Sequence, residues 1–153
     1  MFEGNGTVAS FSVDHTKLKP GLYVSQILKF GETYLTVYDF RFCKPNAGHY
    51  LSNPASHTIE HSLAAWYSAN HKDKVYFGPM GCLTGFYLVL AGKHDVDYVK
   101  ADFPAITKYL AGLKEVPGAT EKTCGNYRMH SLEQARAAWQ EYLKYEDNNV
   151  YPD

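Results

Sequence analysis

The sequence contains no long hydrophobic segment, because no apolar run reaches the roughly 18 residues that a membrane-spanning helix requires. The N-terminal stretch MFEGNGTVASFSVD lacks the basic and apolar regions of a signal peptide. Neither sign of charge is in excess, since the net charge is −1 and acidic and basic residues are interspersed. No nucleic-acid-binding surface or basic membrane-binding patch is therefore expected. We expect a cytoplasmic protein that acts without nucleic acid or membrane.

Cysteine is scarce as well, and the three residues Cys43, Cys82 and Cys124 are odd in number and widely spaced. This pattern argues against a disulfide framework, so each cysteine is a core residue, a metal ligand or a catalyst. Cys43 ends a strand-like run and is predicted to lie in the core. Cys82 follows a turn rich in Gly and Pro, which can expose a thiol to a cleft. Cys124 precedes Gly125 and fits either an exposed turn or a buried structural position.

The length of 153 residues and the hydrophobic content of 45 % predict one domain with a substantial core. Predicted strands and helices are partly segregated along the chain, which indicates an α+β fold: an antiparallel β-sheet with helices packed on one face. We expect a single domain over residues 1–153, with a folded core at 9–146 and a frayed tail at 147–153. The expected strands are 21–30, 34–42, 74–77 and 84–91, and the expected helices are 53–71, 95–113 with a break near Pro104, and one that starts at the capping box Ser131–Gln134.

Local signals place the first hairpin turn and the first helix start. Gly31 and Glu32 lie between the first two strand-like runs, and Asn53 followed by Pro54 is expected to cap the first helix. In the second strand, Asp39 and Arg41 fall on one face. They could line a site at the end of the strand, but a solvated ion pair is the interpretation favoured for such a pair.

The segment His57-Thr58-Ile59-Glu60-His61 carries the strongest indication of chemistry. Residues at i, i+3 and i+4 share one face of a helix, so His57, Glu60 and His61 can converge on one point. Two imidazoles one turn apart are a pair of metal ligands, and the carboxylate between them can transfer protons. The pattern His-x-x-Glu-His also occurs in one group of peptidases. The simpler alternative is a helix with two ordinary histidines and an exposed glutamate.

A catalytic metal usually keeps three protein ligands and one open position, so a third ligand must come from elsewhere. Four residues are candidates from the sequence: Cys124, His130, Glu121 and Cys82. One interpretation is a hydrolase in which Glu60 activates water. A second is an enzyme in which the metal polarises a carbonyl while Glu60 and Cys82 move protons on adjacent carbons. A third is a structural site, closed by four ligands, in a non-catalytic domain.

Several segments in a fixed order resemble LuxS, the S-ribosylhomocysteine lyase family. They are Ser10-Phe11-x-x-Asp14-His15, Asp39-Phe40-Arg41-Phe42-Cys43-Lys44-Pro45-Asn46, the His57–His61 motif, Pro79-Met80-Gly81-Cys82-x-Thr84-Gly85-Phe86-Tyr87, and Cys124-Gly125. The resemblance extends over almost the whole chain. It implies metal-assisted carbonyl migration and β-elimination, which convert S-ribosylhomocysteine into L-homocysteine and 4,5-dihydroxy-2,3-pentanedione, the precursor of the quorum-sensing signal autoinducer-2.

The resemblance also assigns roles to residues of this chain. It implies that His57, His61 and Cys124 bind one Fe²⁺ per subunit, for which Zn²⁺ or Co²⁺ can substitute. Glu60 and Cys82 are then the catalytic proton carriers. The expected contacts to the substrate come from three further positions: Ser10, His15 and Arg41.

The resemblance further implies a homodimer with active sites at the interface, and a place in the activated methyl cycle. Two positions depart from the family pattern. Tyr76-Phe77-Gly78 stands where many members carry Asp-Ile-Ser, and Leu83 replaces a residue that is often polar. The first departure affects the homocysteine end of the substrate, and a family member without activity is therefore a further alternative. A small peptidase with Glu121 or Glu133 as third ligand remains a competing hypothesis.

Overall fold

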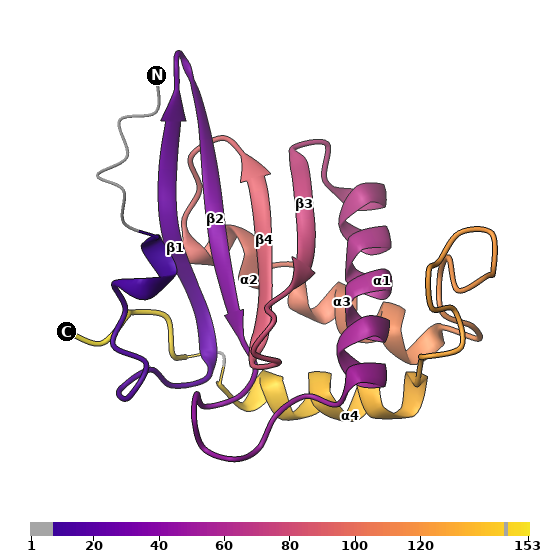
Figure 1. Ribbon diagram of the computed structural model, residues 1–153. Coiled ribbons are helices and arrows are strands. Elements are labelled where there is room, and N and C mark those ends of the chain that lie inside the picture. The colour runs from indigo at the N-terminus through magenta and orange to yellow at the C-terminus, as the bar shows by residue number, and fades with distance from the viewer. Residues whose placement is uncertain (1–7, 146) are drawn as a thin grey trace.

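A four-stranded antiparallel sheet forms the centre of the protein, as the computed structural model shows for residues 8–145 and 147–153 (Figure 1). The strand order is β1-β2-β4-β3, and every neighbouring pair is antiparallel. Residues 1–7, which open the N-terminal stretch considered above, and residue 146, the expected end of the core, lie outside the described residues. The strands are β1 (Gly21–Phe30), β2 (Thr33–Arg41), β3 (Lys74–Pro79) and β4 (Gly85–Ala91).

The expected turn joins β1 to β2, with Gly31 in the left-handed conformation at φ 59°. A residue without Cβ adopts this conformation at little cost, which explains the position of the glycine. All four predicted strands are confirmed: β1 has the predicted ends, and the ends of the other three differ by at most two residues from the sequence prediction. The largest difference is at β3, which continues to Pro79 because Gly78 and Pro79 still pair with β4.

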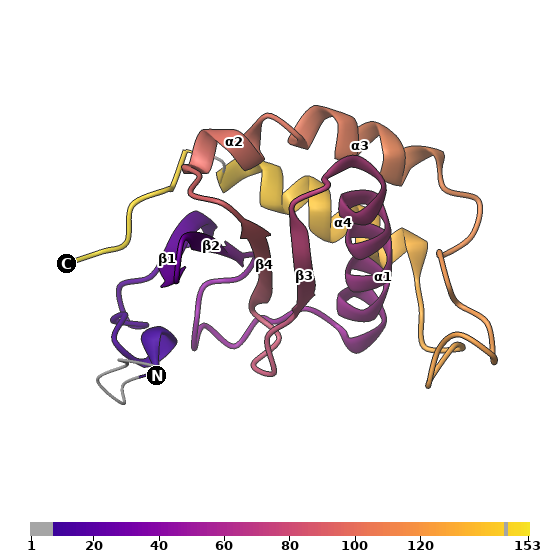
Figure 2. The same cartoon turned by 90° about the horizontal axis from the view of Figure 1, so that it is seen from above.

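The helices gather on one face of the sheet, as predicted (Figure 2). The predicted helix over 95–113 is split ahead of Pro104, and Ser131 caps the last helix by accepting a hydrogen bond from the Gln134 N–H. None of the helices within the described ranges combines the length and the hydropathy that a membrane span needs. The helices are α1 (Asn53–Asn70), α2 (Val96–Lys100), α3 (Phe103–Gly112) and α4 (Leu132–Tyr142), with short 3-10 turns η1 (Ala9–Phe11) and η2 (Leu143–Tyr145).

The cap of α1 differs from the prediction. The Ser52 hydroxyl accepts the hydrogen bond from the Ala55 N–H, while Asn53 is already the first helical residue. Serine and asparagine are about equally good caps, so composition alone could not separate the two adjacent positions. Pro54 occupies the first turn, as expected.

The core lies between the sheet and the helices and is rich in aromatic residues. The Phe42 and Tyr142 rings stack at a centroid distance of 4.2 Å, which joins the end of β2 to α4. Phe40 contacts Phe103 and Tyr142 and so links the sheet to α3 and α4. Cys43 is buried in the same cluster, as predicted. From α1 the side chains of Ile59, Leu63, Trp66 and Tyr67 enter this core. One side of α1 therefore packs against the core, and the histidines of this helix, His57 and His61, lie on another side.

The opposite face of the sheet carries a buried ion pair. Arg41 Nη2 lies 2.7 Å from Asp39 Oδ2, and both side chains are almost fully buried. The prediction of a solvated pair was wrong, because part of the C-terminal tail covers this face. In that tail, the Tyr151 ring stacks on Tyr23 at 4.7 Å, and its hydroxyl donates to Asp39 Oδ2. Burial raises the pKa of Asp39, and the adjacent guanidinium opposes this rise.

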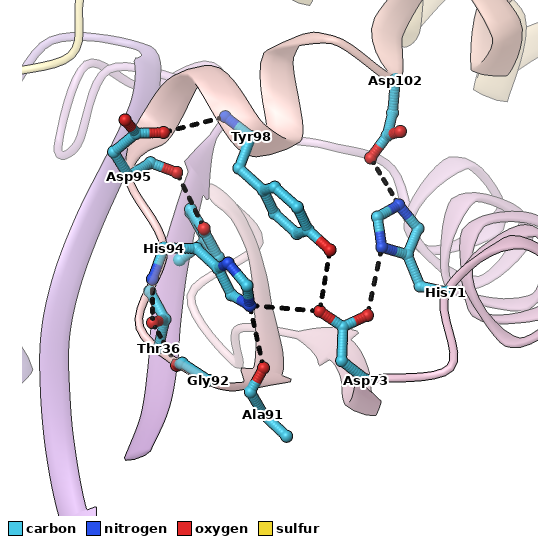
Figure 3. A network of polar contacts seen from close by, with 10 residues as sticks. Thr36, His71, Asp73, Ala91, Gly92, His94, Asp95, Tyr98 and Asp102 are labelled. Atoms are coloured by element: carbon cyan, nitrogen blue, oxygen red, sulfur yellow. Dashed lines mark hydrogen bonds and ion pairs between the residues drawn. The ribbon is translucent and has the colours of Figure 1, made fainter.

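A second polar cluster fixes the end of α1 (Figure 3). His71 Nδ1 lies 3.2 Å from Asp73 Oδ1, and its Nε2 lies 2.8 Å from Asp102 Oδ2. The Tyr98 hydroxyl donates to the other oxygen of Asp73 at 3.0 Å, and His94 Nε2 lies 3.2 Å from that same oxygen. Burial raises the pKa of Asp102, which the facing His71 opposes. The cluster joins α1, the start of β3 and the two helices after β4.

Candidate metal centre

His57 and His61 lie one turn apart on α1, with ring centroids 4.7 Å apart. Both are partly buried, and both point away from the aromatic core, which holds the helix through the side chains named above. The segment 113–131 returns beside this part of α1 before α4 begins (Figure 1). The i, i+4 spacing therefore does place two imidazoles together, as predicted.

Cys124 completes a compact set of ligand atoms. Its Sγ lies 3.4 Å from His57 Nε2 and 3.7 Å from His61 Nε2. A tetrahedral site with metal–nitrogen bonds near 2.0 Å and metal–sulfur bonds near 2.3 Å requires nitrogen–sulfur separations of about 3.5 Å. The observed separations fit this requirement without any movement of the chain. The Cys124 N–H is held by the Thr120 carbonyl at 2.9 Å, which fixes the thiol in its turn.

The backbone fixes the tautomer of both histidines. His57 Nδ1 lies 2.9 Å from the Met129 carbonyl oxygen, and His61 Nδ1 lies 2.8 Å from that of Pro117. A carbonyl oxygen only accepts hydrogen bonds, so each Nδ1 carries the proton. The Nε2 lone pairs then face Cys124 and are free to bind a cation. This donor set, two neutral imidazoles and one thiol, suits a divalent transition metal.

His130 also belongs to the cluster: its ligand atom and those of His57, His61 and Cys124 all lie within 4.8 Å of one another. Its ring stacks on His57 at 3.9 Å, and its Nε2 lies 3.8 Å from Cys124 Sγ. Burial, followed by the two neighbouring imidazoles, lowers the pKa of His130 to about 4. Its Nδ1 faces the Thr58 hydroxyl at 3.1 Å, which can donate or accept, so its tautomer is not fixed in the same way.

His130 was one of the candidate third ligands in the sequence, but the family resemblance pointed to Cys124 instead. The sequence signal that could have indicated both residues is that His130 follows Cys124 by six positions in the same loop. Glu60 lies on the same side of α1, partly buried and adjacent to His61, and is not among the clustered ligand atoms. Glu121 and Glu133 are exposed and do not belong to the cluster either. The third ligand that the peptidase hypothesis requires is therefore not provided.

Cys82 lies in a turn between β3 and β4 and is exposed. Leu83, the next residue, adopts φ 61°, a strained conformation for a residue with a side chain. Its N–H bonds to the Met80 carbonyl at 3.1 Å, which closes the turn. The turn borders a cavity of about 580 Å³. Six of the residues that line it are Ser10, His15, Tyr50, Cys82, Thr84 and Tyr87.

Two of the three predicted substrate-binding residues, Ser10 and His15, thus share a cavity with Cys82. His15 Nδ1 lies 2.8 Å from the Val13 carbonyl oxygen. This contact occupies one ring nitrogen and leaves the second, Nε2, for a further contact. Arg41 does not line this cavity, because its side chain is buried behind Thr84. Arg41 Nη1 donates to Thr84 Oγ1 at 2.7 Å, and that hydroxyl lies 3.0 Å from Cys82 Sγ.

Within one chain the metal ligands and Cys82 are separate. We call His57, Glu60, His61 and Cys124 the metal half, and the cavity around Cys82 the thiol half. No residue of the metal half lines the cavity at Cys82. In both views α1 lies between the sheet strands that carry this turn and the segment that carries Cys124 (Figures 1 and 2).

A larger cavity of about 760 Å³ lies elsewhere, between α4 and the segment that precedes α1. Phe42, Cys43, Ala55 and Ala138 form part of its wall. None of the predicted site residues lines it, so its size does not make it the candidate site.

The fold and the cluster define a small α+β protein with a candidate His/Cys metal centre, built from α1 and from the segment between α3 and α4. Comparison with known proteins identifies the family. The model of the family described as S-Ribosylhomocysteinase (LuxS) matches residues 8–151. A Clostridium beijerinckii protein named S-ribosylhomocysteine lyase is 43 % identical, covering 95 % of this chain and 98 % of its own. Proteins of the same name from Borreliella burgdorferi and Phocaeicola vulgatus are 40 % and 41 % identical, each over 95 % of this chain and at least 97 % of their own. The chain belongs to the LuxS family, and the resemblance predicted from its motifs is confirmed.

Proposed function

We propose that this protein is an S-ribosylhomocysteine lyase, a carbon–sulfur lyase that forms L-homocysteine and 4,5-dihydroxy-2,3-pentanedione. The observation that carries the proposal is family membership over residues 8–151, together with the ligand cluster that this chain assembles. The relatives named above share both the activity in their names and nearly the full length of the chain. Neither the peptidase nor the purely structural alternative explains that similarity.

We propose that His57, His61 and Cys124 hold one Fe²⁺ per subunit, with Zn²⁺ or Co²⁺ as substitutes. This choice of histidines is supported by the backbone carbonyls, which fix the tautomers of His57 and His61 but not that of His130. The His130 ring instead stacks on the His57 ring and holds it in place. When bound, the metal supplies Lewis-acid polarisation of a substrate oxygen. Oxygen should inactivate the iron-loaded protein within hours while the cobalt form persists. An iron enzyme that keeps full activity in air would reject the assignment of iron.

The chain's own residues move the protons. While the carbonyl group migrates from C1 to C3 of the opened ribose, Cys82 and Glu60 take a proton from one carbon and return it to its neighbour. A carbonyl at C3 makes the C4 proton acidic. The Glu60 carboxylate removes this proton, the electron pair forms the C4–C5 double bond, and the C5–sulfur bond breaks. Homocysteine leaves as a thiolate and takes up a proton. The remaining enol gains a proton at C5 and loses its hydroxyl proton, which gives the methyl ketone of 4,5-dihydroxy-2,3-pentanedione. Ser10 and His15 bind the sugar hydroxyls.

We propose that the active enzyme is a homodimer in which the thiol half of one subunit meets the metal half of the other. The separation of the two halves in one chain supports this arrangement. So does the sheet face opposite the helices, where Val37, Val89 and Tyr76 lie on neighbouring strands in register. Tyr76 is 54 % exposed and Val89 is partly exposed, so a second copy on this face would bury both side chains.

A cytoplasmic location, autoinducer-2 formation for quorum sensing and recycling of the activated methyl cycle complete the proposal. The cytoplasmic location is the expectation from the sequence given above, and the other two parts rest on the family resemblance.

Release of free thiol from S-ribosylhomocysteine tests the proposed function. Protein purified without oxygen and loaded with iron or cobalt should release homocysteine, and Glu60→Gln should abolish release while keeping its metal. Glu121→Gln is the matched control, because Glu121 is exposed and lies outside the cluster. Failure of fully metal-loaded wild-type protein to release thiol would reject the lyase assignment.

A further inference from the structure

The Thr84 side chain stands between the buried ion pair and the exposed thiol of Cys82. Its Oγ1 lies 2.7 Å from Arg41 Nη1 on one side and 3.0 Å from Cys82 Sγ on the other. Thr84 is only 2 % exposed, so water does not compete for its hydroxyl. Its backbone is fixed as well, because the Thr84 carbonyl accepts hydrogen bonds from the N–H groups of Phe42 and Cys43.

The direction of the two hydrogen bonds follows from the chemistry of the groups. A guanidinium only donates, so Arg41 occupies one lone pair of the Thr84 oxygen. The hydroxyl has a single hydrogen, and no other acceptor for it is found in the part of the chain that the structure describes. That hydrogen is satisfied when Cys82 is a thiolate and lacks an acceptor when the sulfur is protonated and itself donates. A buried hydroxyl without an acceptor is costly, and hydrogen bonds to charged groups are stronger than neutral ones.

We propose that Thr84 is a positioning residue that couples Arg41 to Cys82 and holds Cys82 as a thiolate ready to accept a proton. The proposal rests on the proposed function, in which Cys82 carries protons between substrate carbons. It also changes the role of Arg41. Instead of contacting substrate, the guanidinium is held by Asp39 at 2.7 Å and acts through the threonine hydroxyl.

Other groups near Cys82 could influence its ionisation. His15 and Tyr50 share its cavity, Tyr87 reaches the cavity from β4, and Asp39 partly offsets the charge of Arg41. Thr84→Val distinguishes the effect of the hydroxyl from the effects of these groups, because valine keeps the shape of threonine and leaves each charged group in place. Thr84→Ser restores the hydroxyl and serves as the matched control.

Alkylation of Cys82 measures the coupling without substrate. The metal-loaded protein is treated with iodoacetamide from pH 5 to 10, and the Cys82 peptide is quantified by mass spectrometry. Because the thiolate is the reactive form, the midpoint of the rate profile reports its formation. We expect Thr84→Val to raise the midpoint by about one pH unit, which slows alkylation about 10-fold at pH values well below both midpoints. Thr84→Ser should keep the wild-type midpoint. Cys43 is the internal control, because burial raises the pKa of its thiol and it should react slowly throughout.

A wild-type midpoint in Thr84→Val would overturn the proposal. If that variant does not fold, Thr84→Ala, which leaves space instead of a methyl group, must show the same upward shift, and an unshifted profile would equally overturn it. In turnover, Thr84→Val should lower kcat with little change in KM, since the hydroxyl does not bind substrate. The alkylation profile needs no catalysis, so it decides on Thr84 even if wild-type protein releases no thiol and the lyase function fails.

Discussion

The Nε2 atom of His57 lies 3.4 Å from the Sγ atom of Cys124, although 67 positions separate the two residues. The chain brings them together without a strand pair or helix contact at Cys124, because the segment 113–131 contains no regular helix or strand. Hydrogen bonds from the His57 and His61 rings to the carbonyls of Met129 and Pro117 hold this segment on α1. A metal bound here therefore ties a long loop to a helix.

Removal of the Cys124 thiol should lower the amount of metal that the protein retains. Cys124→Ala removes the only sulfur of the cluster, and we expect its iron or cobalt content after dialysis to fall at least about 10-fold. Cys43→Ala is the matched control and should retain the metal, because Cys43 lies in the core and outside the cluster. Full metal content in Cys124→Ala would show that another residue supplies the third ligand.

Mixing of two inactive variants tests the shared active site. Cys82→Ala and Glu60→Gln should each retain metal but lose turnover by at least about 100-fold. In a homodimer with shared sites, a mixed dimer carries both changes in one site and none in the other. Equal mixing after reversible dissociation should therefore restore about a quarter of wild-type activity. If each site is built within one chain, the mixture stays inactive. Two copies of Cys82→Ala, mixed in the same way, provide the baseline.

His71 should contribute to stability and not to the reaction. Its two ring nitrogens face the carboxylates of Asp73 and Asp102, and its side chain is 11 % exposed. His71→Ala leaves both carboxylates without this partner, and we expect the free energy of unfolding to fall by about 1–3 kcal/mol in urea titrations. His49→Ala, at an exposed position, should change it by less than about 0.5 kcal/mol. Equal midpoints for His71→Ala and wild type would contradict the role given to this cluster.

We expect the buried Tyr23 to make the protein less stable at high pH. Burial, reinforced by the Asp39 charge, raises the pKa of Tyr23 to about 12, from an ordinary value of 10.0. The folded state thus favours the neutral phenol, whose hydroxyl donates to the Lys19 carbonyl at 2.7 Å. Its contribution is fully present below pH 10 and is lost as the pH rises towards about 12. Urea unfolding between pH 9 and 12 should show a smaller decline for Tyr23→Phe than for wild type. Parallel declines in the two proteins would refute the prediction.

Much of the fold follows from local patterns. The alternation along β2 places Tyr38 and Phe40 on the face opposite Asp39 and Arg41, where the structure buries them, and Pro104 marked the division between α2 and α3. Adjacent residues with similar local preferences were not separable, as Ser52 shows by capping α1 in place of Asn53. Burial of Asp39 and Arg41 could not be predicted either, because it depends on Tyr151, which lies 112 positions from Asp39.

The sequence by itself determined the antiparallel α+β architecture, the shared helical face of His57, Glu60 and His61, and the motifs of the LuxS family. These follow from repeats of two and 3.6 residues and from the order of short segments, which need no knowledge of distant contacts. Only the tertiary structure decided that His130 joins the cluster, that Arg41 reaches Cys82 through Thr84, and that one chain keeps its two halves apart. Each of these depends on where a loop or turn closes against a distant element, and that position is set by packing and hydrogen bonds that no local pattern records.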